Sequence, residues 1–310
     1  MRVVRVADGA QPATLIQDEI LQPEPGPGEV LVYVRAAGVT LAELSWYPTS
    51  HTKSGMARTR AVPGHEFSGL LAAVGKGVGS EQVGLEVFGM NDWFSDGAMA
   101  EYCIAPFSAV APKPHRLSHT EAACVPIGAL TAWQGLFDHA KLQRGECVLV
   151  HGGAGAVGIF AVQLARLHGA RVIATASAHN SDFVSSLGAN QVIDYRATRF
   201  EECLTEVDVV FDTVGGETLD RSWSVLKPGG RMVTVASTAE DSIEPRVKQA
   251  FFIVEPNQKQ LSEIARLLLG GKLRTVVDSV FPLSQAPDVF AGKTARRGRG
   301  KLVIEIGNRD

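Results

Sequence analysis

Residues 147–175 read CVLVHGGAGAVGIFAVQLARLHGARVIAT, and this stretch decides the fold. A short β-branched run leads into a glycine turn, apolar residues at helical spacing follow, and a second short apolar run closes the unit. Within the turn, Gly153, Gly155 and Gly158 satisfy GxGxxG. Glycine removes Cβ atoms where a pyrophosphate must approach the backbone, and the next helix offers free amides and the positive end of its dipole. We therefore predict a dinucleotide-binding βαβ unit; the alternative is a tight βα turn that binds no nucleotide.

The same alternation continues after this unit. From about residue 120 short apolar runs alternate with helical periodicities, and the predicted strands are 147–151, 171–175, 191–194, 208–212 and 231–235. This pattern predicts an α/β domain with a doubly wound parallel sheet. Gly169 is placed to end the first helix as a left-handed cap. Asn257, with Gln260 three residues later, is a capping signal for a later helix that stops at 270–271.

The residues before 120 follow a different pattern. Short apolar stretches are broken by Gly and Pro, as in EVLVYV after the PGPG turn at 25–28, which is typical of a strand-rich domain. After the last predicted helix the tail returns to strand-like runs, VVDSVFPL and GKLVIEI. We therefore expect a strand-rich domain over 1–119, a nucleotide-binding domain over 120–256, and a return segment over 257–310 that completes the first domain.

Composition places the chain among ordinary globular proteins. It has 310 residues, of which 45% are hydrophobic and 20% charged, and its 30 basic and 33 acidic residues give a net charge of −3. This balance provides no positive field for a polyanion, so we expect no nucleic-acid partner. Four cysteines without a CxxC pair favour a reducing, cytoplasmic setting. No apolar run reaches the roughly 18 residues of a membrane helix, so we expect no membrane partner.

The end of the second strand of the βαβ unit is where the ribose of a dinucleotide is read. Here residues 174–180 read ATASAHN, and no Asp or Glu occurs in or after this strand before Asp182. Because no carboxylate would repel a 2′-phosphate, NADPH is favoured over NADH. We predict that Ser177 and Asn180 hydrogen-bond this phosphate and that Tyr195, in the loop after the next strand, closes over it. The alternative is that Ser177 and Asn180 cap the following helix.

Five motifs together resemble the medium-chain dehydrogenase/reductase superfamily. They are PEPGPGEVLVYVRAAGV near the start, PGHEFSG at 63–69, AACVPIGALTAWQGLF at 122–137, HGGAGAVG at 151–158 and DTVGG at 212–216. The ALTAW, ATASAHN and VIDY segments are most similar to the zinc-independent quinone oxidoreductase and enone reductase branch. The resemblance covers nearly the whole chain, and it implies a GroES-like catalytic domain, a Rossmann domain and a C-terminal tail that rejoins the first domain.

The resemblance also bears on zinc. Alcohol dehydrogenases of the superfamily hold a catalytic zinc on a Cys, a His and a later Cys, and the matching positions here are Thr40, His65 and Ile127. A lone imidazole cannot form the open site with three protein ligands that catalytic zinc needs, so no metal is predicted. Cys124 is assigned to the core, and His65 with Glu66 is interpreted as retained scaffold.

The resemblance further assigns residues to the cofactor and to catalysis. The positions that match cofactor contacts are Thr131, Gly155, Ala156, Val157, Val214, Phe252, Ile253 and Val254. Thr40 matches a contact to the substrate or the nicotinamide ribose. The group that stabilises and protonates the product is left open between Thr40, Tyr47, Tyr102 and water, with Thr40 and Tyr47 as the candidate catalytic residues. Trp46, Tyr47 and Trp93 either shape an aromatic pocket for a flat acceptor or are simple packing.

These features favour an NADPH-dependent oxidoreductase that transfers hydride to a quinone or an α,β-unsaturated carbonyl, a small-molecule substrate, without zinc. The alternatives are an alcohol or aldehyde dehydrogenase of the same superfamily, and a non-catalytic scaffold protein that binds a nucleotide. The resemblance implies a homodimer that pairs through an edge strand of the Rossmann sheet. The basic stretch GKTARRGRGK, residues 292–301, is interpreted as a surface loop or, through Lys301, as a contact to the cofactor phosphate.

Overall fold

The predicted strands of the nucleotide-binding unit form one parallel sheet. The computed structural model describes residues 1–9, 13–240 and 242–307. The strands of this sheet are β8 (Cys147–Val150), β9 (Arg171–Ala176), β10 (Gln191–Asp194), β11 (Val207–Asp212) and β12 (Leu226–Thr234). Their order is β10-β9-β8-β11-β12, and every neighbouring pair is parallel. The order reverses between β8 and β11, where open α/β sheets bind ligands beyond the carboxyl ends of their strands. The doubly wound sheet is confirmed.

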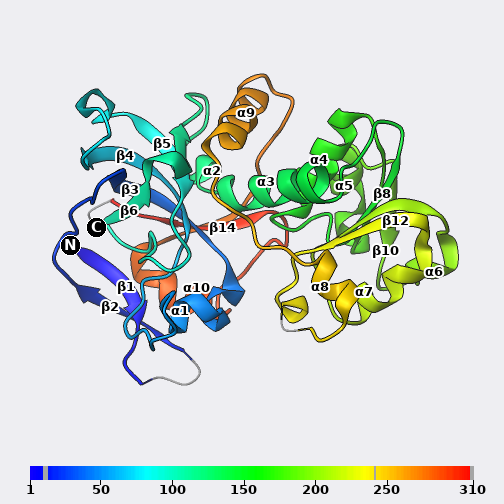
Figure 1. Cartoon of the computed structure of the whole chain (residues 1–310), viewed down its shortest axis with the longest axis horizontal. Coiled ribbons are helices and arrows are strands. Elements are labelled where there is room, and N and C mark those ends of the chain that lie inside the picture. Colours follow the sequence, from blue (N-terminus) through cyan, green and yellow to red (C-terminus); the bar gives the residue numbers. More distant parts are fainter. Residues whose placement is uncertain (10–12, 241, 308–310) are drawn as a thin grey trace.

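Helices connect these strands and cover both faces of the sheet (Figure 1). The α-helices from residue 126 to residue 269 are α3 (Pro126–Trp133), α4 (Gly158–His168), α5 (Ser181–Ser186), α6 (Phe200–Cys203), α7 (Glu217–Ser222), α8 (Pro245–Ala250) and α9 (Gln258–Leu269). α4 ends at Gly169, whose φ of 92° is the predicted left-handed cap. α9 begins after Asn257, whose side chain accepts a hydrogen bond from the amide of Gln260. Both predicted helix signals are confirmed.

A second, larger sheet forms the other half of the molecule. Its seven strands are β3 (Glu29–Val39), β4 (Glu66–Val74), β5 (Glu86–Met90), β6 (Tyr102–Pro106), β7 (Val110–Pro112), β13 (Val277–Pro282) and β14 (Lys301–Glu305). Beside it lie the hairpin of β1 (Arg2–Val6) and β2 (Leu15–Glu19) and the helices α1 (Tyr47–Ser50), α2 (His119–Ala122) and α10 (Ala286–Phe290). β14 pairs antiparallel with β3, with Leu302 opposite Val39. The tail of the chain therefore crosses back into the half that holds β1–β6 (Figure 1).

Two strands are several residues longer than predicted. β3 continues past residue 34 to Val39, because two of its three partner strands, β4 and β14, pair with its second half. Small residues make this crowding feasible: a Cβ on Gly38 would stand 2.6 Å from the Glu66 side chain. β12 begins at Leu226, and its register with β11 shifts around the KPGG turn, where Gly229 has a φ of 76°.

α3 joins the two halves. A Cβ on Gly128 of α3 would stand 2.5 Å from the carbonyl oxygen of Ala156, so the helix lies directly on the glycine turn. The helix continues into a π-helical turn at Gln134–His139, and the side chain of Gln134 bonds both the amide and the carbonyl of Glu255. Among the described residues, no helix has the length and apolar character needed to cross a bilayer.

Candidate active site

The glycine turn presents open backbone to solvent. Gly155 is exposed, Ala156 and Val157 are half-buried, and the amides of Ala156 and Val157 donate to no acceptor within the described residues. Gly158 lies beneath the turn, where a Cβ would stand 2.1 Å from the carbonyl oxygen of Gly152. α4 thus begins tight against the turn with free amides above it. This is the arrangement that an anion such as a pyrophosphate requires, so the turn fits a dinucleotide.

The return segment reaches the same turn. Gly300 donates its amide hydrogen to the carbonyl of Ala154 at 2.9 Å and forms a parallel bridge with Gly155. Gly300 has a φ of 72°, and a Cβ there would stand 2.0 Å from the carbonyl oxygen of Val276. Only glycine fits this position. β14 therefore starts directly beside the predicted phosphate site.

Two of the residues predicted to bind the 2′-phosphate lie together at the end of β9. The amide of Tyr195 donates to the carbonyl of Ala176, the residue before Ser177, at 3.3 Å. Tyr195 is 56% exposed, and the guanidinium of Arg196 lies 5.6 Å from the centre of its ring. Ser177 makes no helix-capping bond, although it precedes the 3-10 turn Ala178–Asn180. The backbones of Ser177 and Tyr195 therefore lie near each other at the end of β9, and the guanidinium of Arg196 lies over the Tyr195 ring.

Asn180 has a different role from the predicted one. It is 8% exposed, its Oδ1 accepts from Nε of Arg299 at 2.6 Å, and its Nδ2 donates to the carbonyl of Gly298 at 3.3 Å. Because both ends of its amide are bonded inside the protein, Asn180 anchors Arg299 instead of facing a phosphate. The capping alternative is wrong for both residues, since neither Ser177 nor Asn180 caps a helix through its side chain.

The basic stretch 292–301 is a surface loop over most of its length, as predicted, with residues 292, 293 and 295–298 exposed. It is anchored at its end. The buried carboxylate of Asp278 accepts hydrogen bonds from three consecutive backbone amides, those of residues 297–299, at 2.7 to 3.0 Å. Arg299 also donates to the carbonyl of His179 at 2.9 Å. The loop therefore carries a guanidinium to the end of β9, a placement that depends on tertiary contacts over more than 100 residues.

Lys301 does not contact the phosphate site. It is 5% exposed, and its ammonium lies 2.5 Å from Oε1 of Glu66 and 2.9 Å from the hydroxyl of Thr40. The second carboxylate oxygen of Glu66 accepts from the amide of Ile127 at 2.9 Å. One buried ion pair therefore ties β14 to β4, to the end of β3 and to α3. The interpretation of Glu66 as scaffold fits this arrangement, whereas the predicted contact between Lys301 and the cofactor phosphate is wrong.

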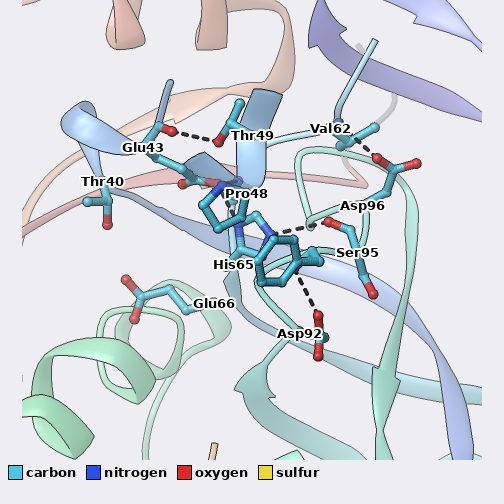
Figure 2. A network of polar contacts seen from close by, with 12 residues as sticks. Thr40, Glu43, Pro48, Thr49, Val62, His65, Glu66, Asp92, Ser95 and Asp96 are labelled. Carbon is cyan, nitrogen blue, oxygen red and sulfur yellow. Dashed lines mark hydrogen bonds and ion pairs between the residues drawn. The ribbon is translucent and has the colours of Figure 1, made fainter. Parts of the chain in front are cut away.

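His65 belongs to a separate buried network (Figure 2). Its Nδ1 lies 2.5 Å from Oε1 of Glu43, which also accepts from the amide of Gly64 at 2.7 Å, and its Nε2 lies 3.3 Å from the carbonyl of Ser95. In the same view Thr40 and Glu66 lie on one side of His65, and the segment Asp92–Asp96 lies on the other.

The residues at the zinc-ligand positions do not fit a catalytic zinc. Of Thr40, His65 and Ile127, only His65 is an ordinary ligand, and both of its ring nitrogens already face partners. The ammonium of Lys301 touches Thr40 and would repel a second cation. Cys124 is buried with its thiol bonded to the carbonyl of Thr120 at 3.4 Å, and burial raises its pKa. No metal-binding group of three or more His, Cys, Asp or Glu occurs in the described part of the chain.

The residues assigned to the nicotinamide end line the carboxyl edge of the sheet. Val214 follows β11, is exposed, and lies near Gly152, where an added Cβ would be 3.5 Å from a methyl of Val214. Asp212 holds this loop by accepting the amides of residues 214 and 215. Burial raises the pKa of Asp212, while the hydrogen bonds from Thr234 and the loop amides act against that rise.

Residues 252–254, between α8 and α9 and here called the crossover, have one exposed side chain of three. Ile253 is exposed, whereas Phe252 and Val254 are buried. The carbonyl of Val254 accepts a hydrogen bond from the indole of Trp93 at 3.1 Å. Trp93 thereby links the first half of the chain to the crossover. Thr131, on α3, is also buried, and its hydroxyl donates to the carbonyl of Ile127 at 2.6 Å.

The aromatic residues predicted to shape a pocket or to donate a proton do not all lie together. Trp46 and Trp93 pack edge to face with ring centres 5.4 Å apart, while Tyr47 stacks on His51 at 4.4 Å. Tyr102 pairs with Tyr33 on β3, six residues before Val39 and so roughly 20 Å from the end of that strand. Tyr102 is therefore remote from Thr40, and Thr40 is the candidate that contacts the buried ion pair.

The sequence does not single out Glu43 or Arg299, and it suggests for Lys301 a contact that the structure does not show. Glu43 gives no signal, because a carboxylate in a short helical turn is normally solvated. Arg299 and Lys301 stand out only as members of a basic run, a pattern that is usually a solvated surface. Their roles follow from partners more than 100 residues away in sequence.

Comparisons with known proteins agree with this architecture. Residues 26–115 match the family described as "Alcohol dehydrogenase GroES-like domain", and residues 187–304 match "Zinc-binding dehydrogenase". A "Probable zinc-binding oxidoreductase, mitochondrial" from Arthroderma benhamiae is 33% identical over 92% of this chain and 92% of its own length. A "2-methylene-furan-3-one reductase" from Solanum lycopersicum is 35% identical over 78% of this chain and 63% of its own length.

A solved structure extends the similarity to the whole fold. The quinone oxidoreductase from Coxiella burnetii superposes with a TM-score of 0.86 at 29% identity, covering 99% of each chain. The match therefore includes both sheets of this chain. With a GroES-like half, a Rossmann half and a whole-length quinone oxidoreductase neighbour, the chain belongs to the medium-chain dehydrogenase/reductase superfamily, in its quinone oxidoreductase branch.

Proposed function

We propose that this oxidoreductase uses NADPH to reduce a quinone or an α,β-unsaturated carbonyl and that it does so without zinc. The observation that carries the proposal is the open glycine turn at Gly155. Gly155 bridges to Gly300, and the next residue, Lys301, forms the buried ion pair with Glu66. A dinucleotide held by the turn would extend toward the first half of the chain. When bound, NADPH supplies a hydride and its electron pair.

The chain's own residues bind and orient this reaction. The amides of Ala156 and Val157 are free to hold the pyrophosphate, and the exposed side chains of Val214 and Ile253 offer apolar surface at the carboxyl edge of the sheet. Quinones and enones accept hydride at an electron-poor carbon, so they need no metal to polarise a simple carbonyl. The name of the Solanum lycopersicum relative, an enone reductase, supports this choice of acceptor.

Turnover tests the reaction class. We expect purified protein treated with a chelator to oxidise NADPH with a panel of quinones and enones, and to give no reaction with simple alcohols and NADP⁺. The measurement is the loss of nicotinamide absorbance, with metal content determined on the same sample. Activity that requires added zinc and uses alcohols would instead indicate an alcohol dehydrogenase, and tight binding of NADPH without turnover would indicate a scaffold protein.

The preference for NADPH has its own test at Ser177. We expect Ser177→Asp to raise the dissociation constant of NADPH by about 100-fold and to leave that of NADH nearly unchanged, because a carboxylate about 4 Å from a phosphate is strongly repelled. Ser177→Asn is the matched control, because asparagine has the size of aspartate but no charge. It should change both dissociation constants by less than about fivefold. Equal effects of Ser177→Asp on the two cofactors would contradict a 2′-phosphate site at this residue.

The homodimer and the cytoplasmic setting remain parts of this proposal. β12 is an edge strand of the five-stranded sheet, which leaves a place where a second copy could pair.

A further inference from the structure

Lys301 is a buried cation in contact with the hydroxyl of Thr40. Its ammonium is held between Oε1 of Glu66 at 2.5 Å and Oγ1 of Thr40 at 2.9 Å. Glu66 is itself fully buried, and its other oxygen is bonded to the amide of Ile127. A buried ammonium is stable beside a carboxylate that balances its charge, so the two groups form a fixed pair.

The contact with Lys301 fixes the direction of the Thr40 hydroxyl. An ammonium has three donors and no acceptor, so Oγ1 of Thr40 must accept from Lys301 and its own hydrogen must point elsewhere. Thr40 precedes the 3-10 turn Leu41–Ser45 but makes no capping bond to it. Within the described residues no acceptor takes the hydrogen of Thr40, and the residue is only half-buried. The hydroxyl is therefore a free donor strengthened by the positive charge behind it.

The pair stands next to the cofactor turn. Lys301 follows Gly300, which bridges to Gly155. Ile127, whose amide donates to Glu66, lies in the first turn of α3, and Gly128 of this helix packs on the same glycine turn. Figure 2 shows Thr40 and Glu66 on the same side of His65. Thr40 is therefore connected through Lys301 and Gly300 to the turn that is predicted to hold the cofactor.

We propose that Thr40 donates the hydrogen bond that stabilises the oxygen of the reduced acceptor, and that Lys301 is the positioning residue that orients and polarises this hydroxyl. The proposal rests on the hydride-transfer function above. The β-carbon of an enone gains hydride from NADPH, the C=C electron pair moves to form an enolate, and its oxygen carries the negative charge next to Thr40. NADPH is oxidised to NADP⁺, and water then supplies the proton that completes the product. Such preorganised donors lower the barrier most where charge develops.

Two pairs of variants test the proposal. Thr40→Val removes the hydroxyl at nearly constant shape, and we expect kcat for an enone to fall about 30-fold or more with the KM for NADPH unchanged, while Thr40→Ser restores most of that loss. The double variant Lys301→Met with Glu66→Gln removes the charge without leaving a lone buried carboxylate, and it should lower kcat by a similar factor. Lys293→Met, an exposed lysine of the same return segment, is the control and should leave kcat unchanged.

The decisive result is how the losses combine. Because Lys301 acts through Thr40, adding Thr40→Val to the Lys301→Met/Glu66→Gln variant should cause little further loss of kcat. A multiplicative loss, or full activity of Thr40→Val, would overturn the proposal. The proposed function fails in a different way, through the absence of quinone or enone reduction by the unmodified chain, so the two failures are distinguishable. Melting curves of every variant ensure that only folded protein is compared.

Discussion

Gly158→Ala is expected to lower the free energy of unfolding by about 3 kcal/mol and to abolish measurable NADPH binding. The added Cβ would stand 2.1 Å from the carbonyl oxygen and 2.8 Å from the carbonyl carbon of Gly152, and 2.9 Å from Cα of Gly153. All of these are backbone atoms, so the turn must move away from α4. For a chain of 310 residues the melting temperature should fall by roughly 5 °C. Thermal unfolding followed by circular dichroism, with a cofactor titration below the transition, measures both effects.

Gly155→Ala is the matched control for Gly158→Ala, because it adds the same methyl group to the turn without overlapping the backbone. A Cβ at Gly155 would meet only the carbonyl oxygen of Gly152, at 3.3 Å, and the residue is exposed without a positive φ. We therefore expect the melting temperature to change by less than about 1 °C. NADPH binding should nevertheless weaken, because the new methyl group occupies the approach of the pyrophosphate. Wild-type cofactor affinity in Gly158→Ala would show that the turn is not the phosphate site.

The second large effect is a loss of stability at acid pH through His151. This histidine is 0% exposed at the end of β8, and its ring nitrogens lie 3.1 Å from the hydroxyl of Thr175 and 2.9 Å from that of Ser222. Burial lowers its pKa from 6.5 to about 3. Between these values the unfolded chain binds a proton that the folded chain does not. The contribution of His151 to stability is therefore complete above pH 6.5 and decreases as the pH falls, by about 2 kcal/mol at pH 5.

His151→Asn isolates this contribution. Asparagine keeps a donor and an acceptor but does not titrate, so the variant should be less stable at pH 7.5 yet should lose about 2 kcal/mol less than the original on going to pH 5. Urea unfolding at the two pH values gives the comparison. Other titrating groups, including Asp212, are the same in both proteins and cancel. Identical pH dependence of the two proteins would rule out His151 as the source.

The agreement between sequence and structure is closest where signals are local. The five parallel strands, the cap at Gly169 and the cap at Asn257 appear where the pattern of apolar residues and turn formers places them. The glycine turn is predictable for the same reason, since Gly158 must lie against the backbone of residues only a few positions away. Periodicity and capping act within one element, so the sequence alone is sufficient to find them.

The interpretations that failed all depended on distant partners. Asn180 is a residue type that often contacts a phosphate or caps a helix. Here, however, its side-chain oxygen accepts a hydrogen bond from Arg299 of the return segment. Lys301 stands in a basic run typical of a solvated loop, yet Glu66, more than 200 residues earlier, buries it. A charged side chain is buried only when a partner compensates for its lost hydration, and the partner's position is a property of the folded chain.

The sequence by itself thus determined the fold family, the order of the elements and the location of the dinucleotide turn, because these follow from local spacing and from motifs carried by neighbouring residues. The tertiary structure alone decided which polar groups are free to act. It joined Thr40 to Lys301 and Glu66, and it paired Asn180 with Arg299 at the end of β9. The physical reason is that hydrogen bonds and ion pairs act over about 3 Å in space, and only folding brings residues more than 100 positions apart to that distance.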